Sequence, residues 1–495
     1  MKIIKSPLSY FRYSNISKKE ILQFFLIFIL SILIVYFTPQ IIIQVYFIVL
    51  LILFWQSEKN YLWIVIFFIF IEEPAGFFTG GLASDIKRLP LYSISKGMSF
   101  SFQDLFIIVF FLKAFQKGKK INLLYQKNLN ILFFYLIFLY IVSMVYGMSI
   151  DKHIYTIRRL MPLSLFIAIP YLIHKSEDYF HMYYLLSIVM IFILMSQLFE
   201  LFTRVKLVSF FKTPSLYDNI SIDTTDRLLR IIETPMINLY CFIMTLFLLS
   251  SRQYHLKKGY LYIIFTICIF SIYLSATRGW IVSYALMILL FIWFNTKNPV
   301  NIIKRFSVPV IILVIIYISM PNVQIQVQKV FNRLETLEYL IKGDITAGGT
   351  LKRLDIRSPR VMSKFKESPI IGFGFSNEYY QYADLHVGNQ NLLLNAGIIG
   401  YLLFLYFWIN FNKEIYQIKK RLPVLHRYKN SIMIFFAGFV GIFIIHSTSM
   451  QFFDYIIGYN RGMILALFFS LANIVIKEIR MEARNENKNM LNSDV

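Results

Sequence analysis

The chain has 495 residues with a formal net charge of +23, and 57% of them are hydrophobic, giving a mean hydropathy of +0.61. Apolar stretches of about 17–22 residues, each long enough to cross a bilayer, recur from one end to the other. This pattern excludes a soluble globular protein. It also means that the basic charge does not predict nucleic-acid binding, because lysine in membrane proteins gathers in cytoplasmic loops.

Backbone N–H and C=O groups inside hydrocarbon find hydrogen-bond partners only within a helix or a closed barrel. Apolar stretches of this length therefore predict helices, and the chain is expected to be an all-α, polytopic integral membrane protein. We expect about 12–14 transmembrane helices in a single membrane domain covering residues 1–495. They are placed at residues 21–37, 39–55, 61–78, 100–115, 128–148, 159–174, 180–202, 231–250, 259–275, 280–295, 306–320, 392–411, 431–448 and 459–476. Charged residues interrupt the stretches near 61–78 and 100–115, with Glu72 in the first and Asp104 in the second. If neither stretch crosses the membrane, the number of transmembrane helices is about 12 and not 14.

The basic N-terminal stretch, from Lys2 to Lys19, precedes a full-length apolar helix and has no small-residue cleavage site. It predicts an uncleaved signal anchor with a cytoplasmic N-terminus. On the topology that follows, lysines fall mainly in cytoplasmic loops such as 412–430. An even number of helices then returns the C-terminus to the cytoplasm.

Arginine is distributed differently from lysine. The arginines on the predicted outer side are Arg88, Arg158, Arg159, Arg204, Arg227, Arg230, Arg278, Arg333, Arg353, Arg357, Arg360 and Arg461. A planar guanidinium binds phosphate oxygens in a bidentate way that lysine does not reproduce, so the set predicts a phosphate-bearing lipid substrate. For any single arginine, pairing with a carboxylate or a lipid headgroup is the alternative.

Two arginine pairs lie where a transmembrane helix is expected to begin. Arg158 and Arg159 precede the helix that starts near residue 160, and Arg227 and Arg230 precede the one that starts near residue 231. An anion held between these helix starts would also meet exposed N–H groups and the positive ends of the helix dipoles. We therefore expect both pairs at an anion site on the outer surface.

The longest external segment is 321–391. Its first part, 324–341, has apolar residues at helical spacing and predicts an amphipathic helix over the outer surface. Residues 344–350 form a flexible break. A second short helix over 350–367 is expected to place Arg353, Arg357 and Arg360 on one face, with a kink at Pro359.

A turn and a histidine follow this loop. Pro369-Ile370-Ile371-Gly372-Phe373-Gly374 precedes His386, and the next apolar helix contains Gly397-Ile398-Ile399-Gly400. A histidine here is a candidate general base, or a group that hydrogen-bonds an acceptor hydroxyl, near neutral pH. The neighbours that we expect to orient it are Asp384, Asn389 and Asn391. A lone histidine is more often structural, and that alternative stays open.

Ser275-Ala276-Thr277-Arg278-Gly279 forms a predicted external hairpin between two transmembrane helices. A charged Arg278 so close to hydrocarbon is costly, so it marks a partner or a ligand, with snorkelling to headgroups as the alternative. Cys241 and Cys268 fall inside apolar helices and give neither a disulfide framework nor a metal spacing. No metal site and no nucleotide-driven step are expected.

The order of these elements resembles the O-antigen ligase/polymerase superfamily of bacterial inner-membrane glycosyltransferases. The resemblance rests on the Arg278 hairpin, the Pro369–Gly374 turn, and His386 followed by Gly397–Gly400. Arg353 lies where the family has its loop arginine. The family commonly has Asn after the histidine, whereas Val387 stands here.

The resemblance implies a multi-pass inner-membrane enzyme whose active site faces the periplasm, with both termini cytoplasmic and 321–391 as a large periplasmic loop. An acceptor sugar hydroxyl attacks a glycan carried on undecaprenyl diphosphate, without metal or cofactor. His386, Arg278 and Arg353 are the expected catalytic residues. The expected diphosphate-binding residues are Arg158, Arg159, Arg227, Arg230, Arg357 and Arg360. The expected partners are the lipid-linked oligosaccharide, an acceptor glycan or glycolipid, and membrane lipids.

Two functions of this family fit the sequence. A polymerase transfers the growing chain to a new lipid-linked repeat unit, and a ligase transfers the finished chain to lipid A–core. The long loop favours the polymerase slightly. A flippase for lipid-linked oligosaccharides is the alternative from another class, but it would need charge along a central pathway and often an internal repeat, and neither is evident.

Overall fold

The computed structural model describes residues 17–72, 89–95, 98–203, 207, 222–223, 228–229, 235–251, 258–295, 307, 310–311, 313–342, 353–384, 386–423, 426–448 and 459–491. For a few of these, Arg353 among them, only the backbone is described.

Helices fill the expected apolar stretches. They are α1 (Lys18–Phe37), α2 (Gln40–Gln56), α3 (Asn60–Glu72), α4 (Phe102–Lys117), α5 (Gln126–Val145), α7 (Leu165–Leu172), α8 (Ser176–Thr203), α9 (Pro235–Ser250), α10 (Lys258–Leu274), α11 (Arg278–Asn295), α16 (Gly388–Arg421), α17 (Met433–Thr448) and α18 (Tyr459–Leu491). In the stretch expected at 306–320, residues 313–319 are helical. Within the described residues, six helices are long and apolar enough to cross a membrane and five more are shorter apolar helices. The predicted all-α polytopic fold is confirmed.

Shorter elements join these helices. They are α6 (Ile150–Leu160), the 3-10 turn η3 (Met161–Ser164), α13 (Pro321–Ile341), the π-helical turn η5 (Arg353–Arg357), α14 (Ser358–Phe365) and α15 (Asn377–Tyr382). Two antiparallel hairpins were not expected: β1 (Leu91–Ser95) with β2 (Met98–Ser101), and β3 (Ile222–Asp223) with β4 (Leu228–Leu229). The expected amphipathic helix at 324–341 is confirmed as α13, which starts three residues earlier.

Polar contacts define one end of the bundle, which we call the base end. Lys59, between α2 and α3, pairs with Glu20 in the first turn of α1. Lys113, near the end of α4, donates to the carbonyls of Phe54 and Ser57 at 2.6 and 2.7 Å. These contacts bring the start of α1, the α2–α3 connection and the end of α4 to the same end.

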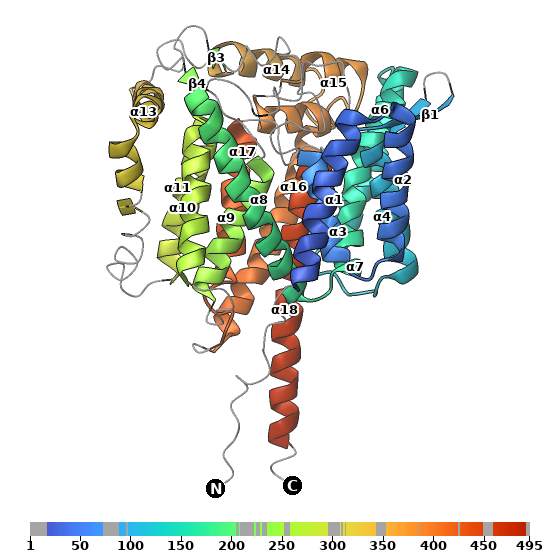
Figure 1. Ribbon diagram of the computed structural model, residues 1–495. Coiled ribbons are helices and arrows are strands. Elements are labelled where there is room, and N and C mark those ends of the chain that lie inside the picture. Colours follow the sequence, from blue (N-terminus) through green and yellow to red (C-terminus); the bar gives the residue numbers. More distant parts are fainter. Residues whose placement is uncertain are drawn as a thin grey trace.

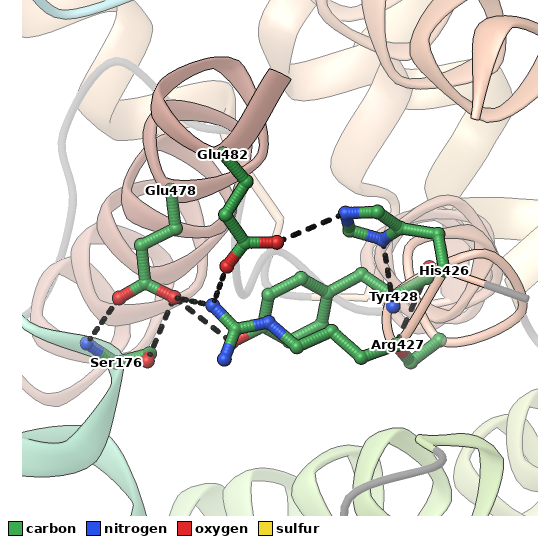
Figure 2. A network of polar contacts seen from close by, with 7 residues as sticks. Ser176, His426, Arg427, Tyr428, Glu478 and Glu482 are labelled. Carbon is green, nitrogen blue, oxygen red and sulfur yellow. Dashed lines mark hydrogen bonds and ion pairs between the residues drawn. The ribbon is translucent and has the colours of Figure 1, made fainter. Parts of the chain in front are cut away.

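A network at the base end also holds α18 (Figure 2). Glu478 accepts hydrogen bonds from the backbone and side chain of Ser176 at 3.2 and 3.0 Å and from the hydroxyl of Tyr428 at 2.9 Å. Arg427 pairs with Glu478 and Glu482, and His426 contacts Glu482 at 3.1 Å. The start of α8, the connection before α17 and the later part of α18 are therefore joined by charge-assisted bonds.

The opposite end, which we call the cap end, is covered by η5, α14 and α15. In Figure 1 these elements lie across the top of the bundle, whereas α18 extends out below it. α6 and the two hairpins lie at the cap end as well. The start of α1 and the last turns of α18 therefore share one end, and η5, α14 and α15 occupy the other.

Two apolar clusters stabilise this arrangement. The larger contains side chains from α1 to α4, α7 to α11 and α16 to α18, such as Phe67, Phe242 and Phe469. The smaller lies under the cap and joins α5, α14, α15 and α16 through Leu139, Val361 and other apolar residues. Large apolar side chains also point outward from the bundle, with Ile41 72% and Phe134 69% exposed, as expected for surfaces in contact with lipid.

Two local expectations were wrong. Asp104 does not interrupt a helix, because it is the third residue of α4 and forms a capping box with Ser101. Pro359 does not kink a helix, because it lies in the first turn of α14, where a missing backbone N–H costs nothing.

Candidate functional site

A broken transmembrane helix lies at the centre of the cap end. α16 changes direction at Gly397, whose φ of 64° and ψ of −172° lie outside the helical region. The break leaves carbonyls without their usual helical donors. The Pro369–Gly374 turn supplies new ones: Phe373 N donates to Leu394 O at 2.9 Å, and Gly374 N donates to Asn395 O at 2.8 Å.

The bonding is reciprocal. Ile398 N and Ile399 N, beyond the break, donate to Pro369 O at 2.9 Å and to Ile370 O at 3.2 Å. The hydroxyl of Tyr135 in α5 donates to Ala396 O. Every one of these backbone groups is thus satisfied inside the protein, which is the condition for a broken helix at membrane depth.

Glycine is required on both sides of this contact. A Cβ at Gly372, where φ is +69°, would lie 2.5 Å from Asn395 O, and a Cβ at Gly397 would overlap the backbone of Ile370. The glycines of the two motifs therefore allow the turn and the broken helix to approach backbone to backbone.

The broken helix begins just after the histidine-bearing turn. His386 is half-buried, and its backbone N–H donates to Asp384 Oδ1 at 3.0 Å. Asn391, which is fully buried in the first turn of α16, accepts from Asp384 N at 2.9 Å and donates to Asp384 O. Asp384 and Asn391 therefore fix the backbone of the turn, whereas Asn389 donates to Ser447 Oγ in α17 at 3.0 Å.

Two of the predicted arginines meet this turn. Arg357 Nη1 lies 3.6 Å from Asp384 Oδ1, and Arg360 Nη2 lies 3.4 Å from Asp384 Oδ2. The two arginines lie at the junction of η5 and α14, so the expected single helix over 350–367 is replaced by a π-turn followed by an α-helix. The guanidinium groups of Arg357 and Arg360 and the backbone N–H of His386 therefore share one carboxylate.

Arg278 also lies at the cap end, but on a different element. It is the first residue of α11, directly after the Ser275 hairpin, and is half-buried. A Cβ at Gly279 would lie 3.0 Å from the Cβ of Thr448, the last residue of α17. The hairpin therefore packs on the end of α17, and the start of α16 at Asn389 packs on that end too.

His446 lies between these parts and was missed as a central residue. It is fully buried near the end of α17, and a Cβ at Gly388 would lie 2.8 Å from its imidazole. Arg461, in the first turn of α18, interacts electrostatically with it. In the sequence, the polar run His446-Ser447-Thr448 at the end of an apolar helix could have indicated a functional residue. Its importance is clear only from the structure, in which Gly279 and Gly388 pack against it.

The expectation for Arg158 and Arg159 was wrong in its geometry. Both lie in the last turn of α6, which the sequence analysis did not anticipate, and not at the start of a transmembrane helix. Arg158 Nη2 pairs with the buried Asp104 at 2.7 Å, and the guanidinium of Arg159 lies 5.0 Å from the ring of Tyr155. The carboxylate-pairing alternative therefore holds for Arg158.

Arg227 and Arg230 lie outside the described residues, and so does the side chain of Arg353. The backbone of Arg353 begins η5, on the same element as Arg357.

An apolar groove of about 690 Å³ runs along the bundle beneath α6. It is lined by Ile157 and Leu160 of α6, by residues of α5 from Leu129 to Tyr140, and by Phe407 and Phe469 of α16 and α18. Some lining side chains are exposed on the bundle surface, with Phe133 58% and Ile157 53% exposed. The groove therefore opens toward lipid and extends from near the cap end toward the start of α5.

α6 connects this groove with the arginine and histidine residues. The hydroxyls of Thr156 and Tyr380 lie 2.8 Å apart, and the ring of Tyr380 faces Tyr155. Tyr380 belongs to α15, and the carbonyl of Tyr382 in the same helix lies 3.5 Å from Arg360. A ligand with an apolar chain and an anionic head fits this combination.

The fold and the site define a polytopic membrane protein with a cationic, histidine-bearing site at one end of its bundle. Residues 263–405 match the family described as O-antigen ligase. The matched region runs from α10 to α16 and includes Arg278, the Pro369–Gly374 turn and His386. This match supports the resemblance read from the motifs: residues 263–405 are similar to the O-antigen ligase family, which supports a function of the O-antigen ligase/polymerase type. A comparison with curated proteins found no match.

Proposed function

We propose that the protein is a membrane glycosyltransferase that transfers a glycan from undecaprenyl diphosphate to an acceptor sugar hydroxyl at the periplasmic face, acting as a surface-polysaccharide polymerase. The observation that carries the proposal is that Arg357 and Arg360 pair with Asp384, which also binds the backbone N–H of His386, inside a region that matches the O-antigen ligase family. The alternative is a ligase acting on lipid A–core, which the description of the matched family favours.

In the proposed reaction His386 takes the proton of the acceptor hydroxyl while the oxygen attacks the anomeric carbon. The bond between that carbon and the diphosphate oxygen breaks, and the lipid diphosphate leaves with the electron pair. Arg278, Arg353, Arg357 and Arg360 stabilise the charge that grows on it. Preorganised cations aimed at a developing anion are usually the largest single contribution to such catalysis.

The groove beneath α6 supports a lipid-linked donor. Its lining is apolar, and the groove opens toward the bilayer, so a polyprenyl chain remains in a lipid-like environment while its diphosphate reaches the arginines. α6 lies between the groove and the arginine site, and it carries two further cations, Lys152 and Arg159. Arg158, Arg227 and Arg230 are also proposed to bind the diphosphate, and substitution of each one separately tests this.

The deciding experiment compares the surface glycans of a strain lacking the gene, its parent and a complemented strain on a gel. Loss of the ladder with a single repeat unit left on the core supports the polymerase. A bare core with long chains still on the lipid carrier supports the ligase. Repeat units trapped on the cytoplasmic face support the flippase alternative and contradict the proposal.

Complementation with variants tests the site. We expect His386→Ala and Arg278→Ala to reduce glycan transfer by about 10²-fold or more, because each removes a group that acts at the transition state. Arg480→Ala is the matched control: Arg480 is 56% exposed on α18 at the base end and lies 4.0 Å from Glu414. Membrane amounts of all three proteins are measured by immunoblot. Normal transfer by both site variants would contradict the assignment.

A further inference from the structure

Asp384 occupies the space between the two arginines that the proposed function assigns to the diphosphate. Its Oδ1 lies 3.6 Å from Arg357 and its Oδ2 lies 3.4 Å from Arg360, while Oδ1 also accepts the backbone N–H of His386. The Asp384 side chain is 13% exposed, but those of Arg357 and Arg360 are 35% and 50% exposed. One carboxylate thus pairs with two guanidinium groups that are both partly exposed to solvent.

We propose that Asp384 is a specificity-determining residue: it acts as a built-in anion that prevents singly charged phosphates from occupying the arginine pair and yields only to a diphosphate. The inference rests on the proposed function, because it assumes that Arg357 and Arg360 bind the donor. It concerns how this site rejects the phosphodiester headgroups of the surrounding membrane.

The ion pairs at Asp384 are long enough to exchange. Charge-assisted N–H···O bonds are typically about 2.7–2.9 Å, and these contacts are longer and partly exposed to water. Among the described residues, Asp384 is the carboxylate that pairs with both Arg357 and Arg360. The guanidinium groups can therefore turn to a ligand without breaking a buried pair.

Competition then depends on charge. A phosphodiester headgroup carries one negative charge, as Asp384 does, but Asp384 is covalently attached and so is present at a high effective concentration. A single phosphate gains little by replacing it. A diphosphate offers two phosphoryl groups and more negative charge, so it can engage both guanidinium forks at once. Discrimination by an unfavourable element against the wrong ligand is a general route to specificity.

The backbone of Asp384 remains fixed while the arginines exchange. The side chain of Asn391, which is fully buried, hydrogen-bonds both the backbone N–H and the backbone C=O of Asp384. The next residue toward the N-terminus, Gln390, has its Nε2 3.4 Å from Ser358 Oγ at the start of α14. The carboxylate therefore keeps its bond to His386 N and continues to position the histidine turn. Exchange of the ligand moves the two arginines and leaves His386 in place.

The test uses the full-length protein in neutral detergent with inorganic pyrophosphate and inorganic phosphate as probes, and thermal stabilisation as the readout of binding. We expect the wild type to bind pyrophosphate more than about tenfold more tightly than phosphate. Asp384→Asn keeps an oxygen for His386 N but removes the charge, and we expect its preference to fall to about threefold or less, chiefly through tighter phosphate binding. Added phosphatidylglycerol should weaken pyrophosphate binding to this variant but not to the wild type.

Glu378→Gln is the matched control, because Glu378 pairs with Lys364 at 2.5 Å on the same cap without touching the arginine pair. It should keep the wild-type preference. Asp384→Ser, which also offers an oxygen to His386 N, replaces Asp384→Asn if the latter does not fold. A wild-type preference in the Asp384 variants would overturn the inference alone, whereas absence of pyrophosphate binding in the wild type would overturn the proposed diphosphate site as well.

Discussion

At the scale of single residues, the contact between Gly372 and Gly397 decides whether the site can form. Both glycines have positive φ, and each would place a Cβ against the backbone of the other motif. The hydrogen bonds from Phe373 and Gly374 across this contact replace those that the break in α16 removes. The motif glycines therefore have a structural reason that is independent of any ligand.

A pair of glycine substitutions separates backbone strain from steric overlap. Gly397→Ala should destabilise the protein by about 3–5 kcal/mol, because it combines a left-handed conformation with overlap against Ile370. Gly147→Ala, at a φ of +72° but with nothing within 4 Å of its Cβ, should cost only about 1–2 kcal/mol. Thermal unfolding in detergent, followed by intrinsic fluorescence, measures both. Equal losses would show that the close backbone contact is unimportant.

At the scale of elements, Asp104 connects three helices that are distant in sequence. It caps α4 through Ser101, accepts a bond from Arg158 at the end of α6, and accepts one from the hydroxyl of Tyr459 at the start of α18. Its side chain is completely buried, so each of these donors compensates for the cost of removing a carboxylate from water. The start of α18, and with it Arg461, is positioned by this contact.

A double-variant cycle tests whether Arg158 is structural. Arg158→Gln should cost about 1–3 kcal/mol, because it leaves Asp104 with less compensation, although Arg158 is 31% exposed. Combining it with Asp104→Asn should recover part of that loss, since the unpaired charge is then absent. Stability and glycan transfer are measured on the same preparations. If Arg158→Gln loses transfer with no change in stability, Arg158 acts on the substrate and not on the fold.

At the scale of the whole molecule, the two ends of the bundle have different chemistry. The base end is closed by specific bonds of Lys113 and by the Glu478 network, whereas the cap end presents exposed arginines and a half-buried histidine. The start of α1 and the later part of α18 both belong to the base end. This arrangement agrees with an even number of crossings and with loop helices on the other side of the membrane.

Thiol labelling in intact cells tests which end faces the periplasm. Cys241 and Cys268 are buried in the bundle, so introduced cysteines dominate the signal. Gln381→Cys lies exposed on α15 at the cap end, and Glu58→Cys lies exposed between α2 and α3 at the base end. We expect a membrane-impermeant maleimide to label the first in intact cells and the second only after lysis. The reverse pattern would place the site in the cytoplasm and contradict the proposed topology.

The sequence by itself determined the fold class and the resemblance to a family. Hydropathy over about 20 residues is a local property, so it identified the helices without any knowledge of their packing. The order of Arg278, the Pro369–Gly374 turn and His386 likewise needed no coordinates, and the family match covers all three. The amphipathic spacing at 324–341 correctly predicted α13.

Only the tertiary structure decided which polar residues meet. Asp384 between two arginines, Asp104 beside Arg158, and His446 beneath Gly388 join positions that are 24 to more than 50 residues apart. Local periodicity carries no information about such contacts, and α6 has too few residues and too much charge to register as a membrane helix. The role of each arginine depends on the nearest carboxylate, which is set by how the helices pack and not by the order of residues along the chain.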